Sequence, residues 1–160
     1  MTRVRQRAFP AHVEGLAAAR AWAAKVLTRA GTLDDPRADA VLVLHELAAQ
    51  VVGRLKPEHT GEAEIGVFVR ADIGAIGVGT VCETRWLRGP PKGDPLRHYR
   101  RPLLEALADD HGTTQDDVLC TCFAELRWHT AARVPVPDHR TAAVHVRPCV
   151  TPPLGGPTLN

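Results

Sequence analysis

Long apolar runs are absent from this sequence of 160 residues. No stretch approaches the roughly 20 consecutive apolar residues that a transmembrane helix needs. The N-terminal stretch MTRVRQRAFPAHVEG also lacks the apolar centre of a secretory signal peptide. We therefore expect a cytoplasmic protein that has no membrane-spanning segment.

Aromatic residues are scarce, at 4% of the chain, and neither sign of charge dominates, because 20 Lys and Arg residues stand against 18 Asp and Glu residues. The formal net charge of +2 is too close to balance to indicate binding to nucleic acid. Few aromatic residues stand among the basic ones, so stacking on bases has little support. We do not expect a nucleic-acid partner.

Cysteine is also infrequent, and four thiols are too few for the disulfide framework of a small secreted domain. The four are Cys82, Cys120, Cys122 and Cys149. Cys120 and Cys122 would lie roughly 7 Å apart on one face of a strand, which disfavours a disulfide between them. Their spacing to histidines matches no compact zinc pattern. We expect free thiols and no metal site.

Helical spacing of apolar residues predicts two long helices in the first third of the chain. The first covers 12–30, and Gly31 follows it where a helix C-cap belongs. The second covers 36–52, because Asp34 and Asp35 precede Pro36, and an aspartate side chain can accept the free backbone N–H groups of a first turn.

Alternation with a period of two predicts the strands. Residues 2–9 form an edge strand whose arginines, Arg3, Arg5 and Arg7, make a basic stripe. Residues 62–70 and 75–84 form a hairpin. The last strand covers 118–128, and the residues in it expected to face inward are Val118, Cys120, Cys122, Ala124 and Leu126. The hairpin residues expected to face the helices are Ile65, Val67, Val69, Ile76, Val78 and Thr80.

A loop rich in proline, glycine and basic residues separates the hairpin from a third helix, expected over 100–112 and ended by Gly112. The basic residues of this segment are Arg85, Arg88, Lys92, Arg97, Arg100 and Arg101. Proline and glycine recur after Thr130, which predicts an extended or disordered tail. We therefore expect one domain over 1–130 and a tail over 131–160.

The order of these elements predicts an α/β two-layer sandwich, in which three helices cover one face of a mixed, mostly antiparallel sheet. Three stretches match a known pattern: ELAAQVVGR at 46–54 is similar to ELVTNAVRH, EALADDHG at 105–112 is similar to EALADRWG, and the last strand contains AEL. These patterns belong to the second helix, the third helix and the closing strand of one family. Over residues 3–128 the chain therefore resembles the histidine-kinase-like ATPase domain (GHKL, or Bergerat, fold) of anti-sigma factor serine/threonine kinases of actinobacteria.

The resemblance implies a catalytic Glu46 and a nucleotide pocket, but the ATP-binding positions depart from the family pattern. Gln50 replaces the Mg²⁺-binding Asn, and its extra methylene displaces the amide from the geometry that Mg²⁺ requires. Cys82, a poor acceptor, replaces the adenine-binding Asp, and Glu83 stands beside it. His98 and Arg100 replace the glycines of a phosphate-binding turn.

These departures favour a non-catalytic regulatory domain that has lost ATP binding and binds a protein such as a sigma factor or an anti-sigma antagonist. The alternative is an active kinase in which Glu46 is the general base, Gln50 holds Mg²⁺ and ATP is the cofactor. A second alternative is a binder of an anionic ligand through the basic segment 85–101. Glu46 and Gln50 can also be a polar pair at the edge of a buried helix. A homodimer is expected, because pairing would cover the edge strand at 2–9.

Overall fold

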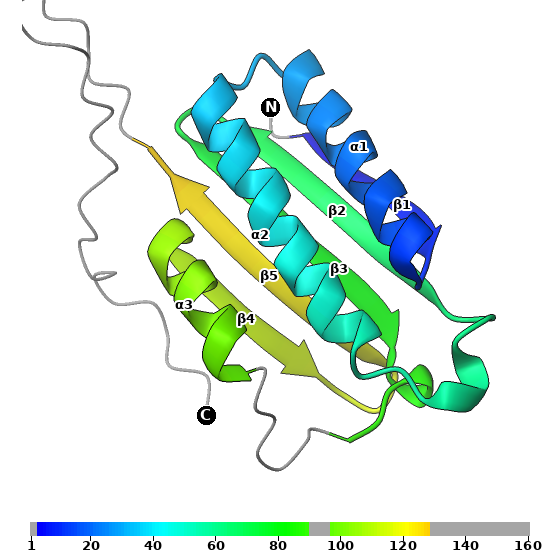
Figure 1. The fold of residues 1–160 in the computed structure, drawn as a ribbon. Coiled ribbons are helices and arrows are strands. Elements are labelled where there is room, and N and C mark those ends of the chain that lie inside the picture. The colour runs from blue at the N-terminus through cyan, green and yellow to red at the C-terminus, as the bar shows by residue number, and fades with distance from the viewer. Residues whose placement is uncertain (1–2, 90–96, 129–160) are drawn as a thin grey trace, which may run out of the picture.

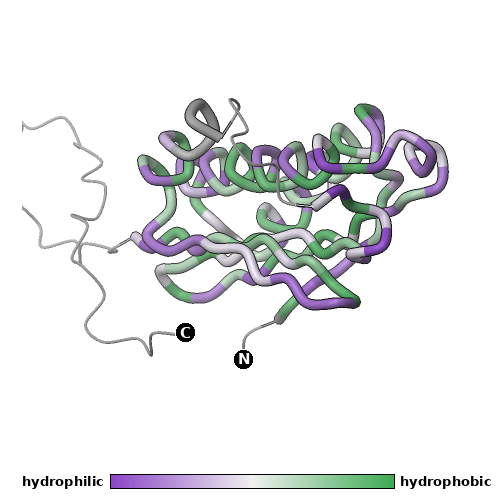
Figure 2. The backbone as a smooth tube through the Cα atoms, turned by 90° about the horizontal axis from the view of Figure 1, so that it is seen from below, coloured by the Kyte–Doolittle hydropathy of each residue, from purple (hydrophilic) through white to green (hydrophobic). Residues whose placement is uncertain are grey.

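The computed structural model of the protein describes residues 3–89 and 97–128, and the expected tail lies outside them. The described residues form two layers, with three helices on one face of a five-stranded sheet (Figures 1 and 2). The other face of the sheet carries no helix from this part of the chain. The expected α/β sandwich class is confirmed, and every strand pair among these residues is antiparallel.

The sheet has the strand order β1-β2-β3-β5-β4. Its strands are β1 (Arg3–Pro10), β2 (Glu64–Asp72), β3 (Ala75–Glu83), β4 (Asp110–Gln115) and β5 (Leu119–Arg127). β1 lies at an edge, as its sequence predicts. β5 is inserted between β3 and β4, so that the last strand of the chain is internal.

Three helices cover the sheet: α1 (Val13–Arg29), α2 (Asp34–Val52) and α3 (Arg97–Leu107). The first two agree with the predicted helices within two residues. The predicted capping of α2 is wrong, because Leu33 occupies the N-cap position and makes no side-chain cap. Asp34 lies instead inside the first turn, where its carboxylate pairs with Arg37. The negative charge of Asp34 also interacts favourably with the positive end of the helix dipole.

The hairpin between β2 and β3 is confirmed. Asp72 pairs directly with Ala75, and Gly74 adopts a φ of +77°, a left-handed conformation that a residue with a Cβ rarely adopts. The residues predicted to face the helices are fully buried, and α2 makes the main helix contact with β3. These residues are Ile65, Val67, Val69, Ile76, Val78 and Thr80.

The third helix and the last strand differ from the prediction at their ends. α3 ends at Leu107 rather than near Gly112, and the chain then forms β4, which the sequence did not reveal. Gly112 lies within β4 opposite Phe123, whose ring covers it. Pairing with β5 therefore decides the structure of this segment. Val118 precedes β5 and is 67% exposed, so its predicted inward position is wrong.

The arginines of β1 lie on the helix-covered side of the sheet. Arg5 is the direct partner of Val69 and Arg7 that of Val67, and direct partners in an antiparallel pair point to the same face. Phe9, two residues farther along, is buried on this face. The basic stripe therefore flanks α1 at the edge of the sheet.

Candidate functional site

The polar residues of α2 that the resemblance singles out share one helical face. Glu46, Gln50 and Arg54 follow one another at intervals of four, which places them in a row along α2 and just beyond its end. Glu46 and Gln50 are half-buried, and neither makes a hydrogen bond or an ion pair with any described residue. Both side chains are therefore available to a ligand or a partner.

Arg54 is held firmly at the end of this row. Its Nη2 donates hydrogen bonds to Gln115 Oε1 at 2.8 Å and to the carbonyl oxygen of Arg88 at 3.2 Å. Its Nη1 donates to Cys120 Sγ at 3.6 Å. Arg54 thus links the end of α2 to β4, β5 and the segment after β3. This role of Arg54 was not predicted, although its spacing of four from Gln50 places it on the same helical face.

Three thiols gather on the helix-covered face beneath this row. Cys82 on β3 and Cys120 on β5 are direct partners in the strand register, and Cys122 follows on the same face. All three are buried. The expectation of free thiols holds for these three, and Cys149 lies outside the described residues.

The environments of the three thiols differ in charge. Burial, helped by the neighbouring Cys120 and Glu83, raises the pKa of Cys82 to about 11. A hydrogen bond from the Cys122 thiol, together with the nearby Arg54 guanidinium, lowers the pKa of Cys120 to about 6. The pKa of Cys122 is raised because its proton is held toward Cys120 and because it is buried. Of the three thiols, Cys120 is therefore the one whose ionisation its surroundings favour.

Cys82 and Glu83, at the expected adenine position, lie at the end of β3. The Cys82 thiol donates a hydrogen bond to the carbonyl oxygen of Glu83, at 3.7 Å. The Glu83 carboxylate is paired with Arg85, whose guanidinium lies 4.3 Å from the centroid of the Trp86 ring. Trp86 in turn packs edge-on against His59. Glu83 is therefore engaged at the surface rather than in a pocket.

His98 and Arg100 occupy the first turn of α3, not a turn that precedes it. The position expected for a phosphate-binding turn is therefore helical. The structure does not describe their side chains, so only some residues of the expected nucleotide pocket can be placed relative to one another. Glu46, Gln50 and Cys82 come from the elements around Arg54, and the charge of Arg54 acts on Cys82.

The basic segment 85–101 is described only in part, and the two arginines in it whose side chains are described already have partners. Arg85 is paired with Glu83, and Arg88 donates from Nε to the carbonyl oxygen of Leu55 at 3.1 Å. Arg88 also donates its backbone N–H to the carbonyl oxygen of Arg54 at 2.7 Å. These contacts attach the start of the segment to the end of α2.

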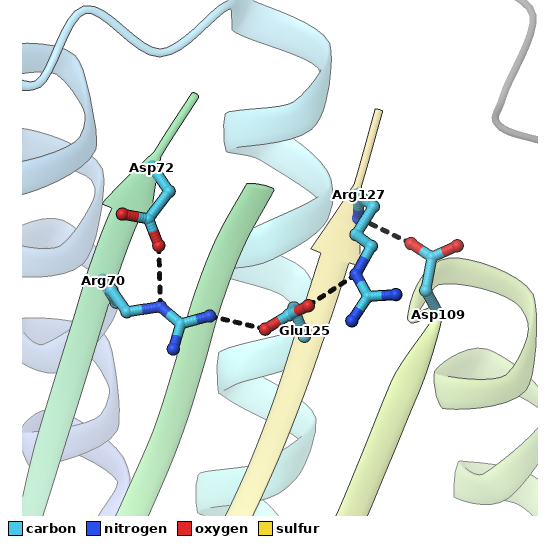
Figure 3. Close-up of polar contacts among 5 residues, drawn as sticks. All are labelled: Arg70, Asp72, Asp109, Glu125 and Arg127. Carbon is cyan, nitrogen blue, oxygen red and sulfur yellow. Dashed lines mark hydrogen bonds and ion pairs between the residues drawn. The ribbon is translucent and has the colours of Figure 1, made fainter. Parts of the chain in front are cut away.

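A second polar cluster lies on the helix-free face of the sheet (Figure 3). Arg70 pairs with Asp72 at 2.9 Å and with Glu125, and Glu125 also pairs with Arg127 at 2.6 Å. The backbone N–H of Arg127 donates to the Asp109 carboxylate. The cations and anions of this cluster satisfy one another, so its evident role is to connect β2, β5 and the junction between α3 and β4.

Across residues 3–89 and 97–128, no three His, Cys, Asp or Glu side chains are placed to hold one metal ion. In the same residues, no helix has the length and apolar character needed to span a membrane. No known protein-family model matches the chain, and no curated protein is significantly similar to it.

Proposed function

We propose that this chain is a regulatory protein-binding domain that resembles an anti-sigma factor ATPase domain and no longer binds ATP. The observation that carries the proposal is the state of Cys82. Its thiol is 2% exposed, and its pKa of about 11 keeps it protonated at neutral pH. A buried, neutral thiol is a weak acceptor for the adenine amino group, which a carboxylate would bind strongly.

The surroundings of Arg54 support the same conclusion. A guanidinium can neutralise phosphate charge, but Arg54 already donates to Gln115, to Arg88 and to Cys120. Rotating it toward a nucleotide would break these hydrogen bonds. The internal contacts of Arg54 therefore compete with phosphate binding.

The partner proposed is a protein, such as a sigma factor or an anti-sigma antagonist, and the mode of action is occlusion of the partner's surface. The half-buried, unpartnered Glu46 and Gln50 provide hydrogen-bonding groups for such a contact. The direct test is calorimetric titration of the full chain with purified sigma factors from the source cell. Binding that prevents a sigma factor from joining core RNA polymerase is expected, and a sigma factor that binds both at once would contradict occlusion.

The loss of ATP binding is tested by thermal unfolding with 1 mM Mg-ATP or Mg-ADP. A ligand that binds the native state with a Kd near 10 µM would add about 2.7 kcal/mol at that concentration, which would shift the midpoint by several degrees. We expect no shift. A clear, Mg-dependent shift that requires Gln50 would contradict the proposal.

An active serine/threonine kinase is the second candidate, because Glu46 and Gln50 lie on one face of α2 and have no hydrogen-bond or ion-pair partner within residues 3–89 and 97–128. In that case Gln50→Ala should abolish a Mg-dependent shift with ATP, whereas Glu46→Ala should preserve the shift and abolish phosphoryl transfer. Under the leading proposal, neither variant changes the response to ATP, because wild-type protein does not respond.

A further inference from the structure

A cavity of about 540 Å³ lies between α1 and the β1 edge of the sheet, on the helix-covered side. α1 contributes Trp22, Val26 and Arg29 to its walls, and β1 contributes Arg5. Ala71 of β2 closes one side. The cavity is thus lined by two cations, by Gln6 and by apolar surface, and it shares no lining residue with the row formed by Glu46, Gln50 and Arg54.

The two cations of this cavity have no anionic partner. Neither Arg5 nor Arg29 makes an ion pair or a hydrogen bond with a described residue. Five arginines elsewhere in the described sheet and loops behave differently, because each of these five has an internal acceptor. These are Arg54, Arg70, Arg85, Arg88 and Arg127.

The position of Trp22 gives the cavity an aromatic wall. Its indole packs edge-to-face against Phe9, with 5.8 Å between the ring centroids, and Phe9 is itself buried. The Arg7 guanidinium also lies over the Phe9 ring, 5.4 Å from its centroid. The contact with a buried ring fixes the orientation of Trp22, so that a half-buried part of its indole remains beside Arg5 and Arg29.

We propose that this cavity binds a small organic anion, in which a phosphate or carboxylate contacts Arg5 and Arg29 and an aromatic or apolar group packs on Trp22 and Val26. Guanidinium groups match the oxygens of both anions, and two of them from different elements can hold one anion. The volume is within the range of small-molecule sites, about 300–1,000 Å³. Charged residues on an edge strand also oppose aggregation, but that role does not require Arg29 of α1 to converge on the same cavity.

Calorimetric titration of the full chain with phenyl phosphate and with phenylacetate tests this site. Inorganic phosphate and phenol report the separate contributions of the anion and the ring. We expect saturable binding of at least one aromatic anion, at least tenfold tighter than inorganic phosphate or phenol. Equal binding of inorganic phosphate and both aromatic anions would overturn the aromatic part of the proposal. No saturable binding of either aromatic anion would overturn all of it.

Arg5→Gln and Arg29→Gln should each weaken the aromatic anion at least tenfold. Arg20→Gln is the matched control, because it removes the same charge from α1 but lines a different cavity, together with Leu42 and His45. The control should change affinity less than twofold. An equal loss in all three variants would show a general charge effect and overturn the site.

Trp22→Leu should reduce the preference for an aromatic anion over inorganic phosphate, and an unchanged preference would contradict the role of the indole.

This site is independent of the proposed loss of ATP binding, although ATP is itself an aromatic organic phosphate. An ATP-induced thermal shift that arises in this cavity should disappear in Arg5→Gln and persist in Gln50→Ala. A shift from a nucleotide pocket beside α2 should show the reverse pattern. The two variants therefore assign any response to one site or the other.

Discussion

The two faces of the sheet are built from the same strands but are covered in different ways. On the helix-covered face, aliphatic side chains of β2 and β3 are fully buried under α1 and α2. On the other face, Phe68 and Phe123 are only half-buried, and no helix from residues 3–89 or 97–128 covers them (Figure 2). The helices shield one face from water, whereas the backbone of the other face is shielded only by side chains of the strands themselves.

Glycines make this second kind of cover possible. Phe68, Gly79, Phe123 and Gly112 follow one another across β2, β3, β5 and β4 in direct register. The Phe68 ring lies over Gly79 and the Phe123 ring over Gly112, where a Cβ would collide with them. An aromatic ring that lies across a glycine of the neighbouring strand shields backbone that would otherwise meet water.

In the next row of the helix-free face, a charged side chain rather than an aromatic ring lies across a glycine of the neighbouring strand. Arg70 crosses over Gly77, where a Cβ would lie 3.5 Å from Nε, and reaches Glu125 on β5 (Figure 3). Aliphatic packing on the covered face should therefore supply most of the stability. The helix-free face should depend on close fit at glycines and, more weakly, on charge pairs that water can screen.

The largest effect is expected on the covered face. Leu44 of α2 is 1% exposed, so Leu44→Ala should lower the free energy of unfolding by about 2–5 kcal/mol through lost burial and a residual cavity. Urea titration measures the change. Leu42→Ala on the same helix is the control, because Leu42 is 43% exposed and its truncation should change stability by less than about 0.5 kcal/mol. Equal losses would mean that α2 packs differently from the arrangement described.

Gly79→Ala should give the next largest effect. The new Cβ would lie 2.5 Å from the Cys122 carbonyl oxygen as well as against the Phe68 ring, and overpacking of this kind costs about 1–3 kcal/mol. Combining it with Phe68→Ala relieves only the ring contact, so the double variant should not recover the stability of Phe68→Ala. Full recovery would show that the backbone contact is unimportant. Gly66→Ala, whose nearest neighbour would be the end of the Gln6 side chain at 3.4 Å, is the control and should be nearly neutral.

Two thiols of the helix-covered face, Cys82 and Cys120, should give opposite pH dependences of the free energy of unfolding. The pKa of Cys82 is raised from 9.0 to about 11, so the folded state binds its proton more tightly than the unfolded state. Its contribution to stability is complete below about pH 9 and is lost as the pH rises toward 11. Cys82→Ala should therefore reduce the decline in unfolding free energy between pH 9 and pH 11.

Cys120 provides the contrasting case. Its pKa is lowered from 9.0 to about 6, so its contribution is complete above about pH 9 and is lost as the pH falls through 6. Cys120→Ala should reduce the rise in unfolding free energy between pH 6 and pH 9. Urea titrations across both windows test the pair, and slopes unaffected by either substitution would contradict the assigned protonation states.

The charge cluster of the helix-free face should give the smallest effect. Arg70, Asp72 and Glu125 are 22–38% exposed in their side chains, and partly exposed ion pairs contribute about 0–1 kcal/mol. A double-mutant cycle with Arg70→Met and Glu125→Gln should give a coupling energy below about 1 kcal/mol that decreases in 1 M NaCl. A large coupling that does not respond to salt would place the pair in a drier environment than this open face provides.

Sequence periodicity identified much of the fold but only fragments of the candidate site. It predicted that Glu46 and Gln50 share a helical face, because positions four apart depend only on helix geometry. It did not predict that Arg54 is bound between β4 and β5, because β4 itself was missed. The segment Asp110–Gln115 contains a glycine and few apolar residues, so its strand structure depends on pairing with β5.

Local patterns in the sequence were sufficient to predict α1, α2, the β2–β3 hairpin and the residues of that hairpin that face the helices. Long-range contacts in the folded protein set the position of β5 between β3 and β4, the pairing of Cys82 with Cys120, and the placement of Arg5 and Arg29 at one cavity. This division arises because helix and strand periods act between near neighbours in the chain. Register and side-chain convergence instead depend on contacts between residues that are distant in sequence, and no local period records them.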